Sequence, residues 1–216
     1  MATYYRTPGI ILTSFNTGEA DRIFVVFTEL FGKIRLRAVS QRKITSKLRG
    51  GLVSCAVVDL EFIQGKVGKT LTAAEVEIHY SNIAKDMKRL RTAFSIFRSM
   101  DVLLSQEQEE QAAWRLIMNS LYALNQKTLD VKTLNLLPYH FLWNLVSLTG
   151  YKPHLNSCVS CKGGVEDRDV FFHAIDGGIK CTRLDSPSKN TAPPGYSKIR
   201  MGFSNLTFPL FLYFTV

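Results

Sequence analysis

The first eighty residues contain five short apolar runs, each separated from the next by turn-forming residues. The runs are residues 9–12, 22–27, 33–40, 52–63 and 71–80. Asn16-Thr17-Gly18 separates the first two, and residues 64–70, with two glycines, separate the last two. Five short strands in about eighty residues suit a small closed barrel, because closure removes the exposed sheet edges.

The apolar period changes after residue 80. One predicted helical face is formed by Ile83, Met87, Leu90, Phe94 and Phe97, which recur at steps of four and three. Four basic residues are predicted to point away from it: Lys85, Lys88, Arg89 and Arg91. Further helices are expected over residues 106–125 and 133–149. Pro138 is expected to kink the last helix or reset its start, and Gly150 stands where a C-cap glycine would.

Basic residues are concentrated near the N-terminus. The formal net charge is +9, and seven Lys or Arg but no Asp or Glu lie between Leu30 and Val58. From Lys33 to Val39 basic and apolar residues alternate, which in a strand sends the cations to one face and the apolar side chains to the other. This pattern predicts a polyanion-binding surface, against the alternative of an ordinary solvated strand face.

We expect no secretory signal, since residues 1–8 contain no uninterrupted apolar run, and no transmembrane segment, since the longest apolar candidate, residues 206–216, is short and contains Pro209. Cys55 stands alone, and the other three cysteines lie close together near the C-terminus. This usage favours a reducing, cytoplasmic setting over a disulfide framework.

Cys158-Val159-Ser160-Cys161, followed by Cys181, predicts a zinc knuckle, with Gly163-Gly164 supplying turn flexibility. A second Cys-x-x-Cys would complete it, but Leu184 occupies the fourth position and cannot bind zinc. His173 or His154 could supply the fourth ligand. The alternative is a degenerate knuckle whose cysteines pack as small hydrophobic residues.

Catalytic motifs are missing. The stretch from Gly65 to Thr70 resembles a phosphate loop, but Ile63 stands where a Walker A motif requires glycine, and strands rather than a helix are expected around it. The four histidines are scattered without an acid at a telling spacing. We therefore expect a binding protein, not an enzyme.

Four segments together resemble the bacterial RecO family of DNA repair proteins, in order and spacing from about residue 5 to residue 181. They are Gly18-Glu19-Ala20-Asp21-Arg22, Phe27-Thr28-Glu29-Leu30-Phe31-Gly32-Lys33, Gln41-Arg42-Lys43-Ile44-Thr45-Ser46-Lys47-Leu48 and the run from Thr149 to Cys161.

The resemblance implies an α+β, multidomain fold. It comprises an N-terminal OB-fold β-barrel that binds nucleic acid (residues 1–80), an α-helical domain (81–150) and a small zinc-knuckle-like insertion (151–184), incomplete here. The family continues into further helices, whereas residues 185–216 form a Pro-rich linker and an apolar tail. We therefore expect an end that is truncated or frame-shifted relative to the family.

The resemblance also implies a nucleoid-associated, cytoplasmic recombination mediator of the RecF pathway. Such a protein binds single- and double-stranded DNA, anneals complementary strands and, with RecR, helps RecA to displace the single-strand-binding protein SSB, whose C-terminal tail docks on the helical domain. The DNA contacts carried over are Arg22, Lys33, Arg35, Arg37, Arg42, Lys43, Lys47 and Arg49. Tyr4, Tyr5 and Phe31 are candidates either for base stacking or for packing.

A different class also fits the basic segment. The protein could be an OB-fold adaptor whose cations meet RNA or an acidic protein partner, with DNA binding incidental.

Overall fold

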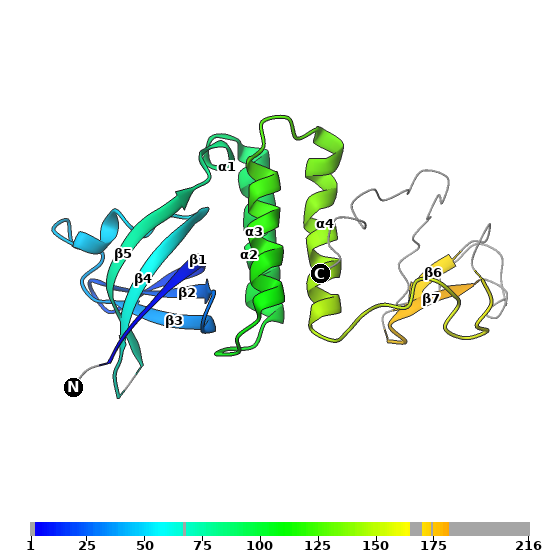
Figure 1. The fold of residues 1–216 in the computed structure, drawn as a ribbon, viewed down its shortest axis with the longest axis horizontal. Coiled ribbons are helices and arrows are strands. Elements are labelled where there is room, and N and C mark those ends of the chain that lie inside the picture. The colour runs from blue at the N-terminus through cyan, green and yellow to red at the C-terminus, as the bar shows by residue number, and fades with distance from the viewer. Residues whose placement is uncertain (1–2, 67, 165–169, 174, 182–216) are drawn as a thin grey trace. The chain divides into compact units, whose positions relative to one another are not determined.

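The computed structural model describes residues 3–66, 68–164, 170–173 and 175–181 (Figure 1). The chain divides after Gly150 into two compact units. The first holds a strand barrel and four helices, and the second holds the short strands β6 (Val170–His173) and β7 (Gly178–Cys181). The expected linker and tail, residues 185–216, lie outside the described residues.

Five strands form the barrel: β1 (Tyr4–Thr17), β2 (Asp21–Thr28), β3 (Gly32–Ala38), β4 (Ala56–Gln64) and β5 (Lys69–His79). They follow one another around the barrel in the order β1-β2-β3-β5-β4, and β4 pairs with β1 (Figure 1). All neighbours are antiparallel except β3 and β5, whose parallel contact joins only two residue pairs. The predicted α+β architecture, with five strands ahead of the helices, is confirmed.

The barrel interior is filled by apolar side chains from alternate strand positions. On β3, Ile34 and Leu36 are buried inside, while Arg35 and Arg37 are exposed. The predicted alternation of basic and apolar faces is therefore confirmed from Ile34 onward.

Four helices follow: α1 (Ser81–Lys85), α2 (Met87–Leu103), α3 (Gln111–Asn125) and α4 (Val131–Leu148), with the three longer ones side by side (Figure 1). Their buried side chains form one cluster with outward-facing residues of the barrel, among them Ile10, Phe27 and Val57. The rings of Phe27 and Trp114 lie 6.0 Å apart across this boundary. None of the described helices combines the length and apolarity needed to cross a membrane.

The buried face predicted for the first helix is confirmed at Ile83 and Phe97 but wrong at two positions. Met87 is 65% exposed and Phe94 is 45% exposed. The residues of α2 that are buried are Arg89, Ala93, Ile96, Phe97 and Met100. The cause is a helix break at Asp86, whose carboxylate accepts hydrogen bonds from the N–H groups of Lys88 and Arg89. A new helix therefore starts at residue 87 and turns a different face inward.

Two other helix boundaries depend on local chemistry. The second long helix begins at Gln111, not near residue 106, because Gln106 forms a bridge with Lys33 of the barrel. Pro138 lies inside α4, and Gly150 follows the end of that helix with a φ of 90°. The predicted C-terminal glycine is confirmed, since this left-handed conformation favours glycine.

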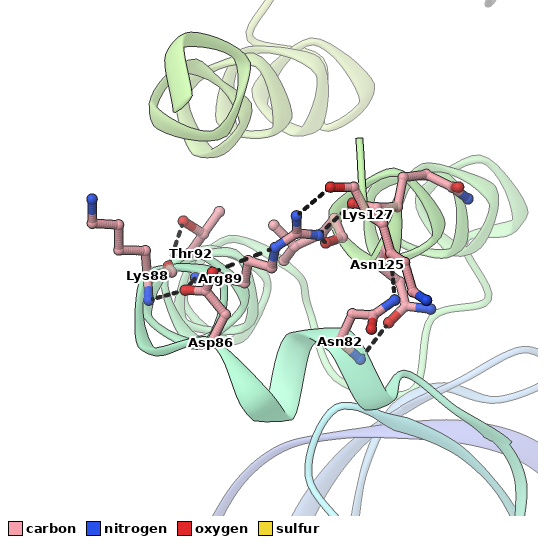
Figure 2. A network of polar contacts seen from close by, with 9 residues as sticks. Asn82, Asp86, Lys88, Arg89, Thr92, Asn125 and Lys127 are labelled. Carbon is pink, nitrogen blue, oxygen red and sulfur yellow. Dashed lines mark hydrogen bonds and ion pairs between the residues drawn. The ribbon is translucent and has the colours of Figure 1, made fainter. Parts of the chain in front are cut away.

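Arg89 was predicted to point away from the buried face, but it belongs to the buried residues of α2 and is only 8% exposed. Its Nη1 donates to the carbonyl oxygens of Leu124 (2.6 Å) and Gln126 (2.5 Å), and its Nη2 to that of Lys127 (3.5 Å). Figure 2 shows this side chain reaching from α2 to the end of α3, near the Asn82–Asn125 pair. Arg89 thus supplies donors to carbonyls that α3 leaves unpaired at its C-terminus.

We expect Arg89→Ala to lower the free energy of unfolding by about 2–3 kcal/mol, because it leaves these partly buried carbonyl groups without their hydrogen-bond donor. Urea denaturation followed by circular dichroism measures the change. Arg91→Ala is the matched control on the same helix: Arg91 is exposed, and its loss should cost less than about 0.5 kcal/mol. Equal losses in the two variants would contradict the capping role.

Gly18 and Gly32 both have a positive φ but differ in the space around them. A β-carbon on Gly32 (φ 62°) would lie 1.8 Å from the carbonyl oxygen of Gln108, whereas one on Gly18 (φ 56°) would meet no atom within 4 Å. Gly18→Ala should therefore cost about 1 kcal/mol of backbone strain. Gly32→Ala should cost roughly 1–3 kcal/mol more, because the α2–α3 connection must move away. Thermal unfolding of both variants measures the difference. Equal decreases in Tm would refute the close approach of Gly32 to the Gln108 carbonyl oxygen.

Candidate nucleic-acid interface and metal centre

Arg35 and Arg37 project from the outer face of β3. Arg35 is paired with Val25 of the neighbouring strand β2, and Arg37 with Ile23. Both arginine side chains are exposed. Gln106, with its amide oxygen turned toward Arg35, accepts hydrogen bonds from Nε and Nη2 of that guanidinium at 3.2 Å. Two predicted DNA-contact residues therefore share one accessible face of the barrel.

Lys33 belongs to the same outer row but is only 7% exposed. Its Nζ donates to the carbonyl oxygen of Asp101 at 2.5 Å and lies 3.6 Å from a carboxylate oxygen of the same residue. The end of α2 therefore covers this part of β3, and the Lys33 ammonium is engaged there. In this arrangement Lys33 links the barrel to α2, and its side chain is largely shielded from solvent.

Asp21 lies among the predicted contact residues. Its Oδ2 accepts hydrogen bonds from Nε (2.9 Å) and Nη2 (2.7 Å) of Arg37, and its Oδ1 accepts one from the Ser40 N–H (2.8 Å). The Ser40 hydrogen bond, followed by those from Arg37, holds the pKa of Asp21 below its ordinary value, and the positive charges of Arg37 and Lys43 add to the effect. One carboxylate therefore joins β2, β3 and the start of the basic loop, residues 39–50.

Arg42 is held by the turn that precedes Asp21. Its N–H donates to the carbonyl oxygen of Ala20 (3.0 Å), and its Nη1 to that of Glu19 (3.1 Å). Arg37, Arg42 and Lys43 therefore come together around the β1–β2 turn.

The remaining predicted contact residues are more dispersed. Arg22 donates from Nε to Oδ1 of Asn16 at 3.0 Å, at the end of the β1–β2 hairpin. Lys47 is exposed, and Lys47 and Arg49 both belong to the short 3-10 helix η1 (Lys47–Arg49). The basic surface thus extends from β3 along the basic loop.

The outer surface of β4 and β5 has the opposite charge, a division that the sequence analysis missed. Asp59 and Glu75 are direct neighbours across these strands, and Glu61 lies two residues further along β4. Arg6 of β1 donates from Nε to Asp59 at 2.7 Å, and the nearby acids raise the pKa of that guanidinium. Acids repel phosphates, so the barrel presents a positive surface on β3 and a negative one on β4 and β5.

Two of the aromatic stacking candidates pack together at one end of the barrel. The ring of Tyr5 stacks on Phe62 at 5.4 Å, and Phe31 meets both rings edge-on at 5.5 Å. Tyr4, in contrast, is 64% exposed. Packing therefore accounts for Tyr5 and Phe31 in this structure.

The glycine-containing stretch from residue 64 to residue 70 is the tip of the β4–β5 hairpin. The Gly65 N–H donates to the Gly68 carbonyl oxygen at 2.8 Å, and Nζ of Lys69 bonds Glu107 at 2.5 Å. Strands on both sides agree with the exclusion of a phosphate loop.

In the second unit, Cys158, Cys161 and Cys181 bring their sulfur atoms within 4.8 Å of one another. The sulfurs of Cys161 and Cys181 lie 3.6 Å apart. Tetrahedral zinc with Zn–S bonds of about 2.3 Å separates its sulfur ligands by roughly 3.8 Å, so these three cysteines fit a zinc ion.

The backbone prepares Cys158 for this role. Burial alone raises the pKa of a thiol, but N–H groups of Cys161, Cys181 and Ser160 donate to its sulfur and together lower the pKa of Cys158 to about 6. The tight turn is made at Lys162, whose φ is 58°. The turn was expected at Gly163 and Gly164, but the φ angles of these two glycines are not in the left-handed region.

The fourth zinc ligand is not found among the described residues, where the group of potential ligands contains only the three cysteines. Nδ1 of His173 lies 2.7 Å from Asp176, and Nε2 of His154 lies 2.7 Å from the Ser157 hydroxyl. Leu184 lies outside the described residues. When bound, zinc would act as a cross-link between the turn and the β6–β7 hairpin.

The fold and these clusters define a barrel-and-helix protein with one cationic strand face and a three-thiol second unit. The family model described as "Recombination protein O N terminal" matches residues 1–81, and the one described as "Recombination protein O C terminal" matches residues 84–201. The chain therefore belongs to the recombination protein O family, RecO. The C-terminal match continues past residue 181, where the sequence analysis expected a departure from the family.

Relatives named "DNA repair protein RecO" give the same result. The protein from Acetivibrio thermocellus is 29% identical over 180 residues, which cover 83% of this chain and 70% of that protein. The protein from Alkaliphilus metalliredigens is 27% identical, over 82% of this chain and 70% of that protein. The protein from Rubrobacter xylanophilus is 28% identical, over 88% of this chain and 77% of that protein.

We expect purified protein to contain about one zinc ion per chain by inductively coupled plasma mass spectrometry, and Cys158→Ser to remove most of it. Cys55→Ala is the control, since Cys55 lies buried in the first unit, where burial raises its pKa to about 11 and keeps the thiol protonated. Zinc far below one equivalent in the wild type would contradict the site.

Proposed function

We propose that this chain is a DNA-binding recombination mediator of DNA repair that acts without catalysing a covalent reaction. It binds single- and double-stranded DNA and anneals complementary strands. With RecR, it helps to load RecA onto DNA coated by SSB. Family membership and the names of the relatives support the DNA repair role.

The observation that carries the proposal is the predominantly positive surface on and beside β3. Arg35 and Arg37 are exposed there, and the exposed Arg42, Lys43 and Lys47 continue the row along the basic loop. Cations in such a row bind successive phosphates and release their counterions. They carry no base-specific information, which suits a protein that must bind any sequence.

We also propose that the barrel is an OB-fold, since a five-stranded barrel with an accessible strand face is the framework that this fold uses to bind oligonucleotides. In annealing, the basic surface would lower the repulsion between two strands while leaving their bases free to pair.

The SSB tail has a candidate docking place on α2. Met87, Arg91, Phe94 and Arg98 are exposed at positions that recur on one helical face. Two apolar and two basic side chains match a tail that is both apolar and acidic. We therefore assign SSB docking to this face, and a zinc-stabilised second unit to Cys158, Cys161 and Cys181.

We expect Arg35→Glu combined with Lys47→Glu to weaken binding to every single-stranded sequence by about tenfold or more. The slope of log affinity against log salt should fall by about 0.7 for each phosphate that the variant no longer binds. Fluorescence polarisation of a labelled oligonucleotide at several salt concentrations measures both. Arg37 is left unchanged because a glutamate there would face Asp21 and disturb the basic loop.

Arg91→Glu combined with Arg98→Glu is the matched control, since it reverses two charges on α2. It should leave DNA affinity unchanged and lower affinity for an acidic, apolar SSB-tail peptide. Salt-independent DNA binding by the wild type would refute the proposal. Tight binding without faster strand annealing, or preference for structured RNA in competition, would favour the adaptor function instead.

A further inference from the structure

Asp21 is an acid within a surface that is proposed to bind a polyanion. Its side chain is 14% exposed and contacts Arg37, one of the exposed cations. Electrostatics alone says that such a carboxylate weakens DNA binding, because it neutralises a cation and repels phosphates. Its contacts indicate a different role.

The Asp21 carboxylate holds two separate parts of the basic surface at once. One oxygen fixes the guanidinium of Arg37, and the other binds the backbone of Ser40. Ser40 has a φ of 54°, a conformation that a serine adopts only when its surroundings hold it. The turns that follow start from this residue, since the Lys43 N–H donates to the Ser40 carbonyl and the Ser46 N–H to that of Lys43.

The pairing does not hide Arg37 from a ligand. Its side chain remains 59% exposed although two of its N–H groups are bonded to Asp21. A guanidinium that is already held in place loses less conformational entropy when a phosphate binds. The same holds for Lys43, whose position depends on the turn at Ser40.

We propose that Asp21 is a positioning residue for the DNA-binding surface, which it orders by fixing Arg37 and the basic loop together. This inference rests on the proposed function. Removing the negative charge of Asp21 from the surface therefore weakens the binding of a polyanion.

The test is Asp21→Asn, which keeps the shape of the side chain and raises the net charge by one. We expect single-strand affinity to fall roughly three- to tenfold, because charge-assisted hydrogen bonds are removed, and the salt slope to become shallower. If Asp21 acted only through its charge, affinity would rise and the slope would steepen by about 0.7. An affinity equal to or above that of the wild type overturns the proposal.

Glu19→Gln is the matched control in the same turn. It makes the same change in charge, but Arg42 contacts the Glu19 backbone carbonyl and not its exposed carboxylate. We expect wild-type or slightly tighter binding. A loss equal to that of Asp21→Asn would overturn the specific role of Asp21.

Asp21→Glu covers the case in which Asp21→Asn does not fold. It preserves the charge and displaces the carboxylate by one methylene, so weaker binding supports positioning and unchanged binding overturns it. Amide hydrogen exchange at Ser40 and Lys43 tests the ordering without DNA: protection should fall in Asp21→Glu, and unchanged protection overturns the inference. If the wild type binds no DNA, the proposed function fails, and this exchange result still stands by itself.

Discussion

The barrel is covered by helices on one outer face, and this contact determines what the rest of the first unit can do. Ile10, Phe27 and Val57 point outward and would be exposed in an isolated barrel. Their burial against α2 and α3 adds hydrophobic stabilisation to a small barrel. The faces that remain accessible then carry charge, positive on β3 and negative on β4 and β5.

The strands were predictable because barrel closure requires alternation, and alternation is visible in the sequence. The register of α2 was not predictable from apolar spacing alone. Met87 and Phe94 read as core because they are apolar, but the cap at Asp86 begins a new helix that turns them outward. Arg89 was predicted to point away from the buried face because it is charged. Its partners are backbone carbonyls at the end of a different helix, and no sequence pattern marks them.

In the candidate sites too, sequence patterns predicted some features, while others depend on tertiary contacts. The cations of β3 were found by their alternation, but the burial of Lys33 depends on where α2 ends, which is a tertiary fact. The three clustered cysteines were found by their spacing, and the structure shows how the β6–β7 hairpin brings Cys181 to the other two. The importance of Asp21 could have been suspected because it is one of few acids near the basic segment, but its bonds to Arg37 and Ser40 required coordinates.

The short contact between β3 and β5 gives the basic loop a second task. Beyond Thr70, the described part of the chain offers β5 no strand partner on its β3 side. Gly51, the residue that follows the loop, approaches β5 so closely that a β-carbon on it would lie 1.8 Å from the Ala74 carbonyl oxygen, whereas one on Gly50 would meet no atom within 4 Å. The loop therefore carries the proposed ligand-binding cations, and the chain at its end also packs against β5. A side chain at Gly51 would collide with the β5 backbone, so the path of the chain past Ala74 requires glycine at this position.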